Sequence, residues 1–346
     1  MKSIHLKQFL LASLVIQVFS ISCSDQLEID LPEHPSIGVI NSILSTDVPV
    51  SVTLTCSRPY PSNADTSSAI SNAEVKIYKD GVYMEDLTFQ RYHVGNKVYR
   101  DYLSHDNLVP EIGHQYNVKV IAQGFPEMAA ETTIPEPVPI ISVDTLTDQI
   151  QFGSQSTEAW EFNIRFQDPP AKGNYYRLLI DRAAYNEDLG VGPMGLIHVR
   201  VGFISNDLNL VYFERARDSF YFLNMDNDIE DALKPDVFLS DETFNGQEYL
   251  LKLYVPKYLF LDIAFPPVPG TKFDMRKLYF KLYSVNEEFY SYASSYFAQR
   301  YKVNDIFSEP IQVRSNIKNG SGIFTGSSVS VDSSIAVPVR YSPLLK

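Results

Sequence analysis

The sequence has few cysteines and fewer basic than acidic residues, and each shortage argues against a class of protein. Two cysteines in 346 residues exclude a disulfide-stabilised scaffold and a cysteine-rich zinc module. Lysine and arginine number 29 against 42 aspartates and glutamates, a formal net charge of −13. Phosphate recognition needs a basic surface, so no nucleic-acid partner is expected. No apolar run reaches the roughly 18 residues of a transmembrane helix.

Aromatic residues are plentiful, although tryptophan is nearly absent. The chain has 22 tyrosines and 21 phenylalanines against one tryptophan, a composition that favours β structure. Apolar residues make up 45% and charged residues 21%, as in an ordinary globular protein. The length is typical of two domains, each able to bury a core.

Residues 1–22 have the pattern of a cleaved signal peptide. Lys2 and Lys7 precede a 13-residue apolar core, FLLASLVIQVFSI, and Ser22 stands directly before Cys23. A cysteine after a small residue is the mark of a bacterial lipoprotein signal, in which the thiol is lipidated and the chain is cut before it. The alternative is a signal cleaved elsewhere with Cys23 incidental, because Ser20 replaces the usual leucine of that motif.

Cleavage before Cys23 leaves 324 residues with 27 basic and 42 acidic side chains, a net charge of −15. Acyl chains on Cys23 would then hold the protein at a membrane. Residues 23–36 are expected to form an acidic tether and linker, with Ser24, Asp25 and Glu28 near its start. This start resembles the surface-export tag of Bacteroidota lipoproteins, which implies export to the outer face of the outer membrane. A solvated acidic tether is the alternative.

Residues 37–134 are expected to form a first domain of about seven short strands, an immunoglobulin-like β-sandwich. Its strand signals lie at 37–44, 48–56, 73–78, 98–103 and 116–122. Within the second, Cys56 follows Val50, Val52 and Leu54 on one face, which predicts a core position. Lys79-Asp80-Gly81 predicts a hairpin turn. Three prolines in 134–139 (IPEPVP) then mark a boundary.

Residues 140–346 are expected to form a larger β domain that carries one helix. Its strand signals are 140–146, 160–166, 175–181, 198–203, 211–213, 249–255 and 277–283. Residues 286–301 show helical spacing of Phe289, Ala293 and Phe297. Gly320 and Gly322, amid strand formers, predict a bulge or a close approach of two backbones.

No motif for catalysis or a cofactor is found in the sequence. His93, His105 and His114 lack the i, i+4 spacing of paired zinc ligands on a helix, although neighbouring strands could still bring them together. The acidic run from Asp226 to Asp231 is not an EF-hand, because aspartate stands where the loop needs glycine. An irregular calcium site and a solvated loop both remain open there. Gly190, Gly192 and Gly195 are read as a loop.

A crowd of tyrosines in the second half has two readings. The members are Tyr254, Tyr258, Tyr279, Tyr283, Tyr290, Tyr292, Tyr296 and Tyr301. A tyrosine has an apolar body and a polar tip, which suits a half-buried core and a binding surface alike.

Taken in order, several segments resemble a domain-of-unknown-function family of Bacteroidota outer-membrane lipoproteins often encoded beside TonB-dependent receptors. The segments are the acidic start after Cys23, Ser71–Val75, Ile134-Pro135, Trp160–Pro170 with Tyr175-Tyr176, Ser240-Asp241 with Phe244–Gly246, Tyr290–Tyr292, Phe307–Pro310 and Ser315–Phe324. Ser321 departs from the apolar residue expected between the glycines. The resemblance implies location, architecture and a receptor neighbourhood, and it carries over no catalytic residue.

These observations lead to one main expectation and two rivals. The main one is a non-enzymatic, surface-exposed outer-membrane lipoprotein that helps a TonB-dependent receptor to capture an unidentified nutrient. An adhesion or structural interaction protein is the first rival. A hydrolase with a site assembled across strands is the second.

Overall fold

The computed structural model describes most of the chain from Pro35 onward. From Ser36, the described residues belong to one compact unit. The described residues are 35–57, 68–94, 97–152, 155–184, 197–203, 205, 207–211, 237–257, 275–302, 309 and 311–338. Within them the fold is mainly β with one α-helix, which confirms the predicted fold class.

An eleven-stranded sheet runs through the described residues, and we call it the long sheet. Its main path is β13-β14-β11-β16-β17-β1-β2-β6-β5, with β12 beside β11 and β18 beside β16. The bounds are β1 Gly38–Ser45, β2 Ser51–Cys56, β5 Thr88–Val94, β6 Lys97–Leu103, β11 Tyr175–Ala184, β12 Ile197–Arg200, β13 Leu210–Val211, β14 Val237–Ser240, β16 Met275–Val285, β17 Ser321–Asp332 and β18 Ala336–Pro338.

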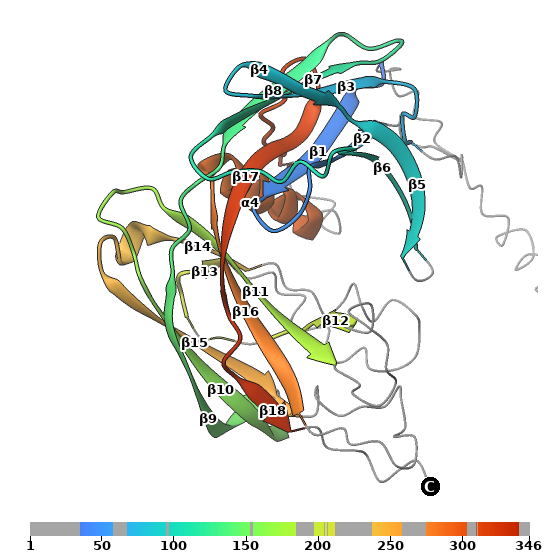
Figure 1. The fold of residues 1–346 in the computed structure, drawn as a ribbon. Helices are drawn as coiled ribbons and strands as arrows, with labels where there is room; N and C mark the ends of the chain where they lie inside the picture. Colours follow the sequence, from blue (N-terminus) through green and yellow to red (C-terminus); the bar gives the residue numbers. More distant parts are fainter. Residues whose placement is uncertain are drawn as a thin grey trace, which may run out of the picture. The chain divides into compact units, whose positions relative to one another are not determined.

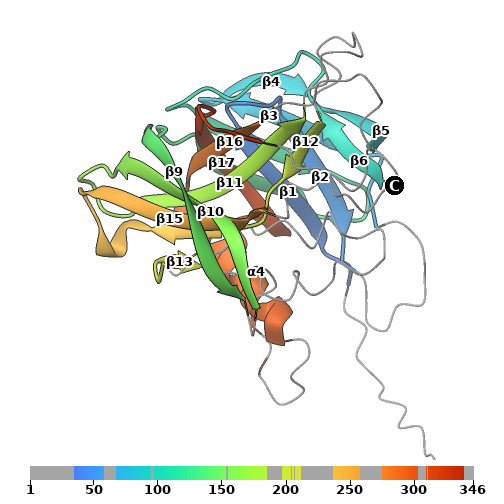
Figure 2. The same ribbon diagram turned by 90° about the horizontal axis from the view of Figure 1, so that it is seen from below.

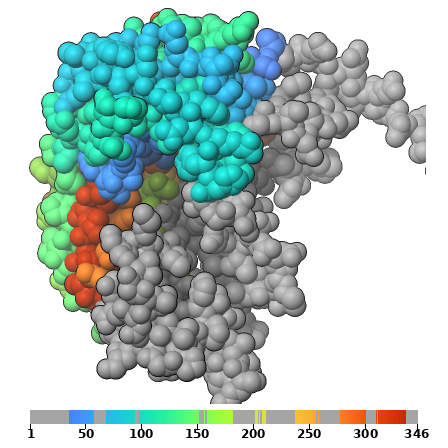
Figure 3. Space-filling model, turned by 45° about the vertical axis from the view of Figure 1, so that its right-hand side comes forward, coloured from blue at the N-terminus to red at the C-terminus, as the bar shows by residue number. Residues whose placement is uncertain are grey.

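At the centre of the long sheet, two distant segments pair. Strand β17 runs parallel to β1, with Val39 opposite Ser321 and Ser45 opposite Ser327, and antiparallel to β16. Figure 1 shows β17 beside β1, and Figure 3 shows red C-terminal atoms next to blue N-terminal atoms on one face. The late strand β17 therefore joins the early strands to the later ones.

Gly322 makes this close pairing possible. Its φ is +103°, and a Cβ added there would lie 2.0 Å from the carbonyl oxygen of Ile40. Only glycine takes this conformation at low cost. A Cβ on Gly320 would likewise lie 2.9 Å from the carbonyl oxygen of Gly38. The predicted close approach of two backbones at these glycines is confirmed.

Two smaller sheets complete the β structure of the residues described above. The four-stranded sheet has the order β4-β3-β7-β8, and the three-stranded sheet the order β15-β10-β9. Figure 2 shows β15, β10 and β9 side by side. The bounds are β3 Glu74–Lys79, β4 Val82–Asp86, β7 Gln115–Ile121, β8 Met128–Thr133, β9 Ile140–Phe152, β10 Gln155–Gln167 and β15 Glu248–Pro256.

The hairpin between β3 and β4 has the predicted turn. Asp80 and Gly81 both have positive φ, 51° and 77°, and Lys79 pairs with Val82. Two central residues with positive φ define the type I′ turn, whose twist matches that of paired strands.

Both smaller sheets pack on the same face of the long sheet. One hydrophobic cluster joins Ile40 of β1 to Val118 of β7, and we call it the first core. The second core joins Phe280 of β16 to Phe162 of β10. Directly paired residues on neighbouring strands point to the same face. Strand β16 contributes Phe280 to the second core, and its neighbour β17 contributes Phe324 to the first core from the same face. The long sheet is therefore one layer of two β-sandwiches, and each smaller sheet is the second layer of one of them.

The helix α4, Glu287–Lys302, covers the opposite face. Side chains alternate along a strand, so Tyr283 and Val285 of β16 point away from the second core. They pack instead with Phe289 and Ala293 of the helix. The helix predicted at residues 286–301 is thus confirmed, and its apolar stripe is used for packing.

The strand predictions are confirmed for the longest alternating segments and incomplete elsewhere. Strands β5, β8 and β14 lie where no strand is expected from the sequence. The core position predicted for Cys56 is wrong: the free thiol is only half-buried, because Cys56 is the last residue of β2 and pairs with the first residue of β1. The division into two domains at residues 134–140 stays a prediction. Strand β17 lies after this boundary in the sequence, yet its Phe324 belongs to the first core.

Candidate functional site

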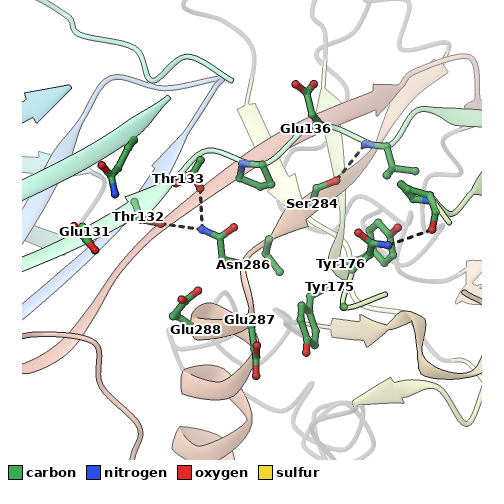
Figure 4. Close-up of a pocket in the computed structure, with 17 residues that line it drawn as sticks. Glu131, Thr132, Thr133, Glu136, Tyr175, Tyr176, Ser284, Asn286, Glu287 and Glu288 are labelled. Carbon is green, nitrogen blue, oxygen red and sulfur yellow. Dashed lines mark hydrogen bonds between the residues drawn. The ribbon is translucent and has the colours of Figure 1, made fainter. Parts of the chain in front are cut away.

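A pocket of about 550 Å³ lies where the end of the four-stranded sheet meets the start of α4. Figure 4 shows its walls converging from strands, loops and the helix start. The described lining residues are Gln115, Glu131, Thr132, Thr133, Pro135, Glu136, Val138, Pro169, Gly173, Asn174, Tyr175, Tyr176, Ser284, Val285, Asn286, Glu287 and Glu288. Its size is in the usual range for a small-molecule site.

Asn286 fixes one wall of the pocket. Its Nδ2 donates to Thr132 Oγ1 at 2.8 Å and to the carbonyl oxygen of Thr133 at 2.9 Å (Figure 4). The backbone carbonyl of Asn286 accepts from the amides of Phe289 and Tyr290, so the same residue begins α4. The end of β8 and the start of the helix are therefore held together by one side chain.

Thr132 also binds the long sheet. Its Oγ1 accepts from the amide of Gly326 in β17 at 2.8 Å, in a buried position. A Cβ added to Gly326 would lie 2.6 Å from the carbonyl oxygen of Thr133, so the close approach needs glycine. We call Thr132, Asn286 and Gly326 the Thr132 junction.

Serines on the long sheet hold the connection that follows β8. Ser284 Oγ accepts from the amide of Val138 at 3.1 Å (Figure 4), and Ser330 Oγ accepts from that of Ile140 at 3.0 Å. Ser328 is paired with Ser284 across the strands, and so faces the same side. Its hydroxyl is fully buried and has no hydrogen-bond partner among the described residues.

Two buried aspartates lock the loops that form the far wall. Asp168 accepts from the Tyr176 hydroxyl and from the amide of Gly246 at 2.8 Å. Asp241 accepts from the amide of Gly173 and from Asn174 Nδ2 at 3.1 Å. These N–H and O–H donors occupy the carboxylates, which therefore serve to fix the loops.

Burial shapes the ionisation of this wall. It raises the pKa of the Asp168 carboxyl, and it also raises the pKa of Tyr176, to which the hydrogen bond to Asp168 adds. The pKa of Tyr175 is raised mainly by burial and further by the negative charge of Glu287. Both phenols therefore stay neutral at physiological pH.

The open rim of the pocket is acidic. Glu131, Glu136, Glu287 and Glu288 are all exposed and come from β8, the connection after it and α4. None of the described lining residues is a lysine, an arginine or a histidine. The side chains around the pocket thus offer negative charge and hydrogen-bond acceptors.

The residues predicted for anchoring and export lie outside the described residues. This applies to Cys23, Ser24, Asp25 and Glu28, to the acidic run at Asp226 and to the glycines of residues 190–195. Their predicted roles stay predictions.

The three histidines of the first half do not form a metal site. His93 is exposed on β5, His105 pairs with its neighbour Asp106, and His114 Nδ1 lies 2.5 Å from Asp80 Oδ2. No group of three or more histidine, cysteine, aspartate or glutamate side chains among the described residues is placed to hold a metal ion. The three-histidine alternative is therefore wrong.

The core reading is confirmed for part of the tyrosine crowd, the binding reading stays a prediction, and Tyr258 lies outside the described residues. Tyr283 and Tyr290 pack against the core under α4, while Tyr296 is 39% exposed. The pocket instead uses Tyr175 and Tyr176, which the sequence marks only as the start of a strand and as part of the segments that resemble the lipoprotein family. No helix in the described part of the chain is long and apolar enough to cross a membrane.

Comparison with known proteins shows the family to which the chain belongs. No curated protein matches the chain. A family described as a domain of unknown function, DUF4249, matches residues 24–333. That match spans both cores, the helix and every described residue that lines the pocket, and so this protein belongs to the DUF4249 family.

Proposed function

We propose that the protein is a surface-exposed outer-membrane lipoprotein that binds a ligand without transforming it, as an accessory of a TonB-dependent uptake receptor. The pocket at the Thr132 junction is the observation that carries the binding role. Support for the location comes from the signal pattern that ends at Cys23 and the acidic residues behind it.

The chemistry of the pocket supports binding. Tyr176 is bound to Asp168, and Asn286 to Thr132. Groups held in this way can orient a ligand, because a few fixed polar groups set the position of a molecule in a pocket. The raised pKa of Tyr176 keeps its phenol in the neutral form.

Location and partner are tested together. Mass spectrometry of the protein from native membranes should find an acylated Cys23, and the Cys23→Ala variant should be released from the membrane fraction. Crosslinking in intact cells should join the wild-type protein to a TonB-dependent receptor. An unmodified N-terminus elsewhere in the chain would contradict the anchor, and crosslinks that contain no such receptor would contradict the accessory role.

A second candidate function, adhesion, is favoured by strand β4. This edge strand exposes Val82, Tyr83 and Met84, which are 64%, 50% and 40% exposed. Consecutive apolar residues on an open edge suit pairing with another protein. If Val82→Lys and Met84→Lys abolished attachment of cells to a surface or to each other while uptake continued, adhesion would replace the accessory role. Turnover of a bound ligand would instead favour the hydrolase.

A further inference from the structure

The chain contains two Asn-Gly dipeptides, Asn245-Gly246 and Asn319-Gly320, and the fold places them in different surroundings. In such a pair the amide nitrogen of the glycine can attack the side-chain carbonyl carbon of the asparagine, because glycine has no side chain to obstruct the approach. The reaction needs the attacking nitrogen to be close to that carbon and free of other bonds. The two sites can therefore be compared by what their glycine amides contact.

At Asn245-Gly246 the attacking nitrogen is occupied. The Gly246 amide donates to Asp168 Oδ2 at 2.8 Å, and Asp168 is fully buried. Attack requires the amide to lose its proton, and a neighbouring carboxylate opposes the negative charge that this loss creates. The fold therefore protects Asn245.

At Asn319-Gly320 the attacking nitrogen is available. The Gly320 amide has no hydrogen-bond partner among the described residues, and Asn319 is exposed to the water that the reaction consumes. Asn319 Nδ2 donates to the carbonyl oxygen of Glu127 at 3.0 Å, in an exposed position. Lys318 stands directly before Asn319 and is also exposed, and its positive charge favours loss of a nearby amide proton.

We propose that Asn319 is a site of spontaneous deamidation. The Gly320 nitrogen forms a bond to Asn319 Cγ, the bond from Cγ to Nδ2 breaks, and Nδ2 leaves as ammonia with the proton that the Gly320 amide gives up. Water then adds to one of the two carbonyl carbons of the resulting cyclic imide and opens it to aspartate or isoaspartate. Neither residue lines the pocket, so this site goes beyond the proposed binding role.

The modification falls where β17 is fastened. Lys318 exchanges two backbone hydrogen bonds with Ala129, at 2.8 and 3.3 Å, and Ser321 begins the pairing of β17 with β1. Isoaspartate inserts an additional carbon in the main chain between these two contacts. The chain has little room for it, because even a Cβ on Gly320 would lie 2.9 Å from the carbonyl oxygen of Gly38. One of the two contacts must therefore open, and the start of β17 is then held less firmly against β1.

Peptide mapping by mass spectrometry of the full chain, incubated in its native state at mildly alkaline pH, tests the site. Asn319 should accumulate aspartate and isoaspartate at least about tenfold faster than Asn245, because only its glycine amide is free. Equal rates in the native protein, or a faster reaction at Asn245, would overturn the assignment.

The same mapping in concentrated urea separates the effect of the fold from that of the local sequence. Both glycine amides are then free, so the two sites should react within about threefold of each other. A tenfold difference that persisted in urea would contradict the protection assigned to the bond between Gly246 and Asp168.

Two substitutions provide matched controls. Asn319→Gln lengthens the side chain and disfavours closure of the ring, so this variant should release less ammonia than the wild type. Asn245→Gln removes the protected dipeptide and should release as much ammonia as the wild type. Equal release from the two variants would show that Asn319 is not the reactive site.

Hydrogen exchange tests the consequence for the fold. Incubated wild-type protein that carries isoaspartate at position 319 should exchange backbone hydrogens faster in β1 and at the start of β17 than fresh protein, with β9 and β10 unchanged. The incubated Asn319→Gln variant should exchange like its fresh form. Unchanged exchange in β1 despite the modification would show that the turn absorbs the added carbon, and would overturn the loosening of β17.

Discussion

The two sandwiches share one floor but differ in how their cores are completed. The first core draws most of its members from Ile40 to Ile134, yet it also contains Ile317 and Phe324 from late in the chain. The second core runs from Val138 to Leu282 and takes no buried member from the residues before Val138. One core therefore depends on a distant strand, while the other is built almost entirely from its own segment.

This difference shows that a core of this protein need not be built from one continuous segment of the sequence. The parallel pairing of β1 and β17 buries Phe324 in a core whose other members, from Ile40 to Ile134, come mostly 190 to 284 positions earlier. A defect in β17 should consequently weaken the first core more than the second. The predictions below test that asymmetry.

The largest effect is expected from Gly322→Ala. The new Cβ would clash with the carbonyl oxygen of Ile40, and the alanine would have to adopt a φ of +103°. Strain of this kind should lower the free energy of unfolding by more than about 4 kcal/mol. The control is Gly124→Ala, with a φ of +86° and no neighbour within 4 Å of the added atom, which should cost about 1–2 kcal/mol. Urea unfolding that showed equal losses in both variants would remove the argument from close pairing.

Phe324→Ala tests the dependence of the first core directly. Removal of this fully buried ring should cost about 3–5 kcal/mol. Hydrogen exchange should increase in β3 and β7, whose buried residues belong to the same core as Phe324, before it increases in β9 and β10. Phe280→Ala, an equally buried change in the second core, should show the reverse order. The same exchange pattern in both variants would mean that the two cores unfold as one.

Thr132→Val tests the Thr132 junction, which joins β8 to the start of α4 and to β17. Valine keeps the shape of threonine but leaves the Gly326 amide and one of the two Asn286 Nδ2 hydrogens without an acceptor, while the other still donates to the carbonyl oxygen of Thr133. Two unsatisfied donors should cost about 2–3 kcal/mol, as measured by thermal or urea unfolding. The neighbouring Thr133→Val, at an exposed side chain, should change stability by less than about 0.5 kcal/mol. A junction variant as stable as this control would show that water replaces the lost hydroxyl.

The smallest effect is expected from the loss of a tyrosine–aspartate hydrogen bond, and two such bonds can be compared, Tyr176 to Asp168 and Tyr92 to Asp101. Tyr176→Phe leaves a fully buried Asp168 with one donor fewer and should cost about 1–3 kcal/mol. Tyr92 binds Asp101 at 2.9 Å nearer the solvent, where burial and Asp101 raise the pKa of Tyr92 to about 12. Because Thr53 also donates to Asp101, Tyr92→Phe should cost about 0.5–1 kcal/mol. Chemical denaturation should rank the two variants in that order, and the opposite ranking would contradict the role given to burial.

Local signals predicted the parts of the fold that depend on local structure. The alternation from Trp160 to Phe166 identifies β10, where Phe162, Ile164 and Phe166 are fully buried. Helical spacing located α4, and Asp80-Gly81 located a hairpin. In each case the periodicity or the turn chemistry acts within a dozen residues.

Long-range features escaped because no local pattern encodes them. Gly320 and Gly322 indicated a close approach, but nothing near them names β1 as the partner strand. The pocket combines the ends of β8 and β16 with loops and a helix start, and its carboxylates look like ordinary surface residues in the sequence. Cys56 continued an apolar alternation that ends at the edge of β2, so its burial was overestimated.

The parallel pair of β1 and β17 also sets an order of events. The Ser327 hydroxyl donates to the carbonyl oxygen of Leu44, 283 residues away, so the first half cannot close its sheet until the last strands have been made. Such remote contacts slow folding because a long loop must close before they form. A ribosome or an export channel that releases the chain from its N-terminus would therefore release β1 long before its partner. Factors that keep early strands from aggregating would matter most during that interval, and a chain cut short of β17 would be recognisable to proteases by its unfinished first half.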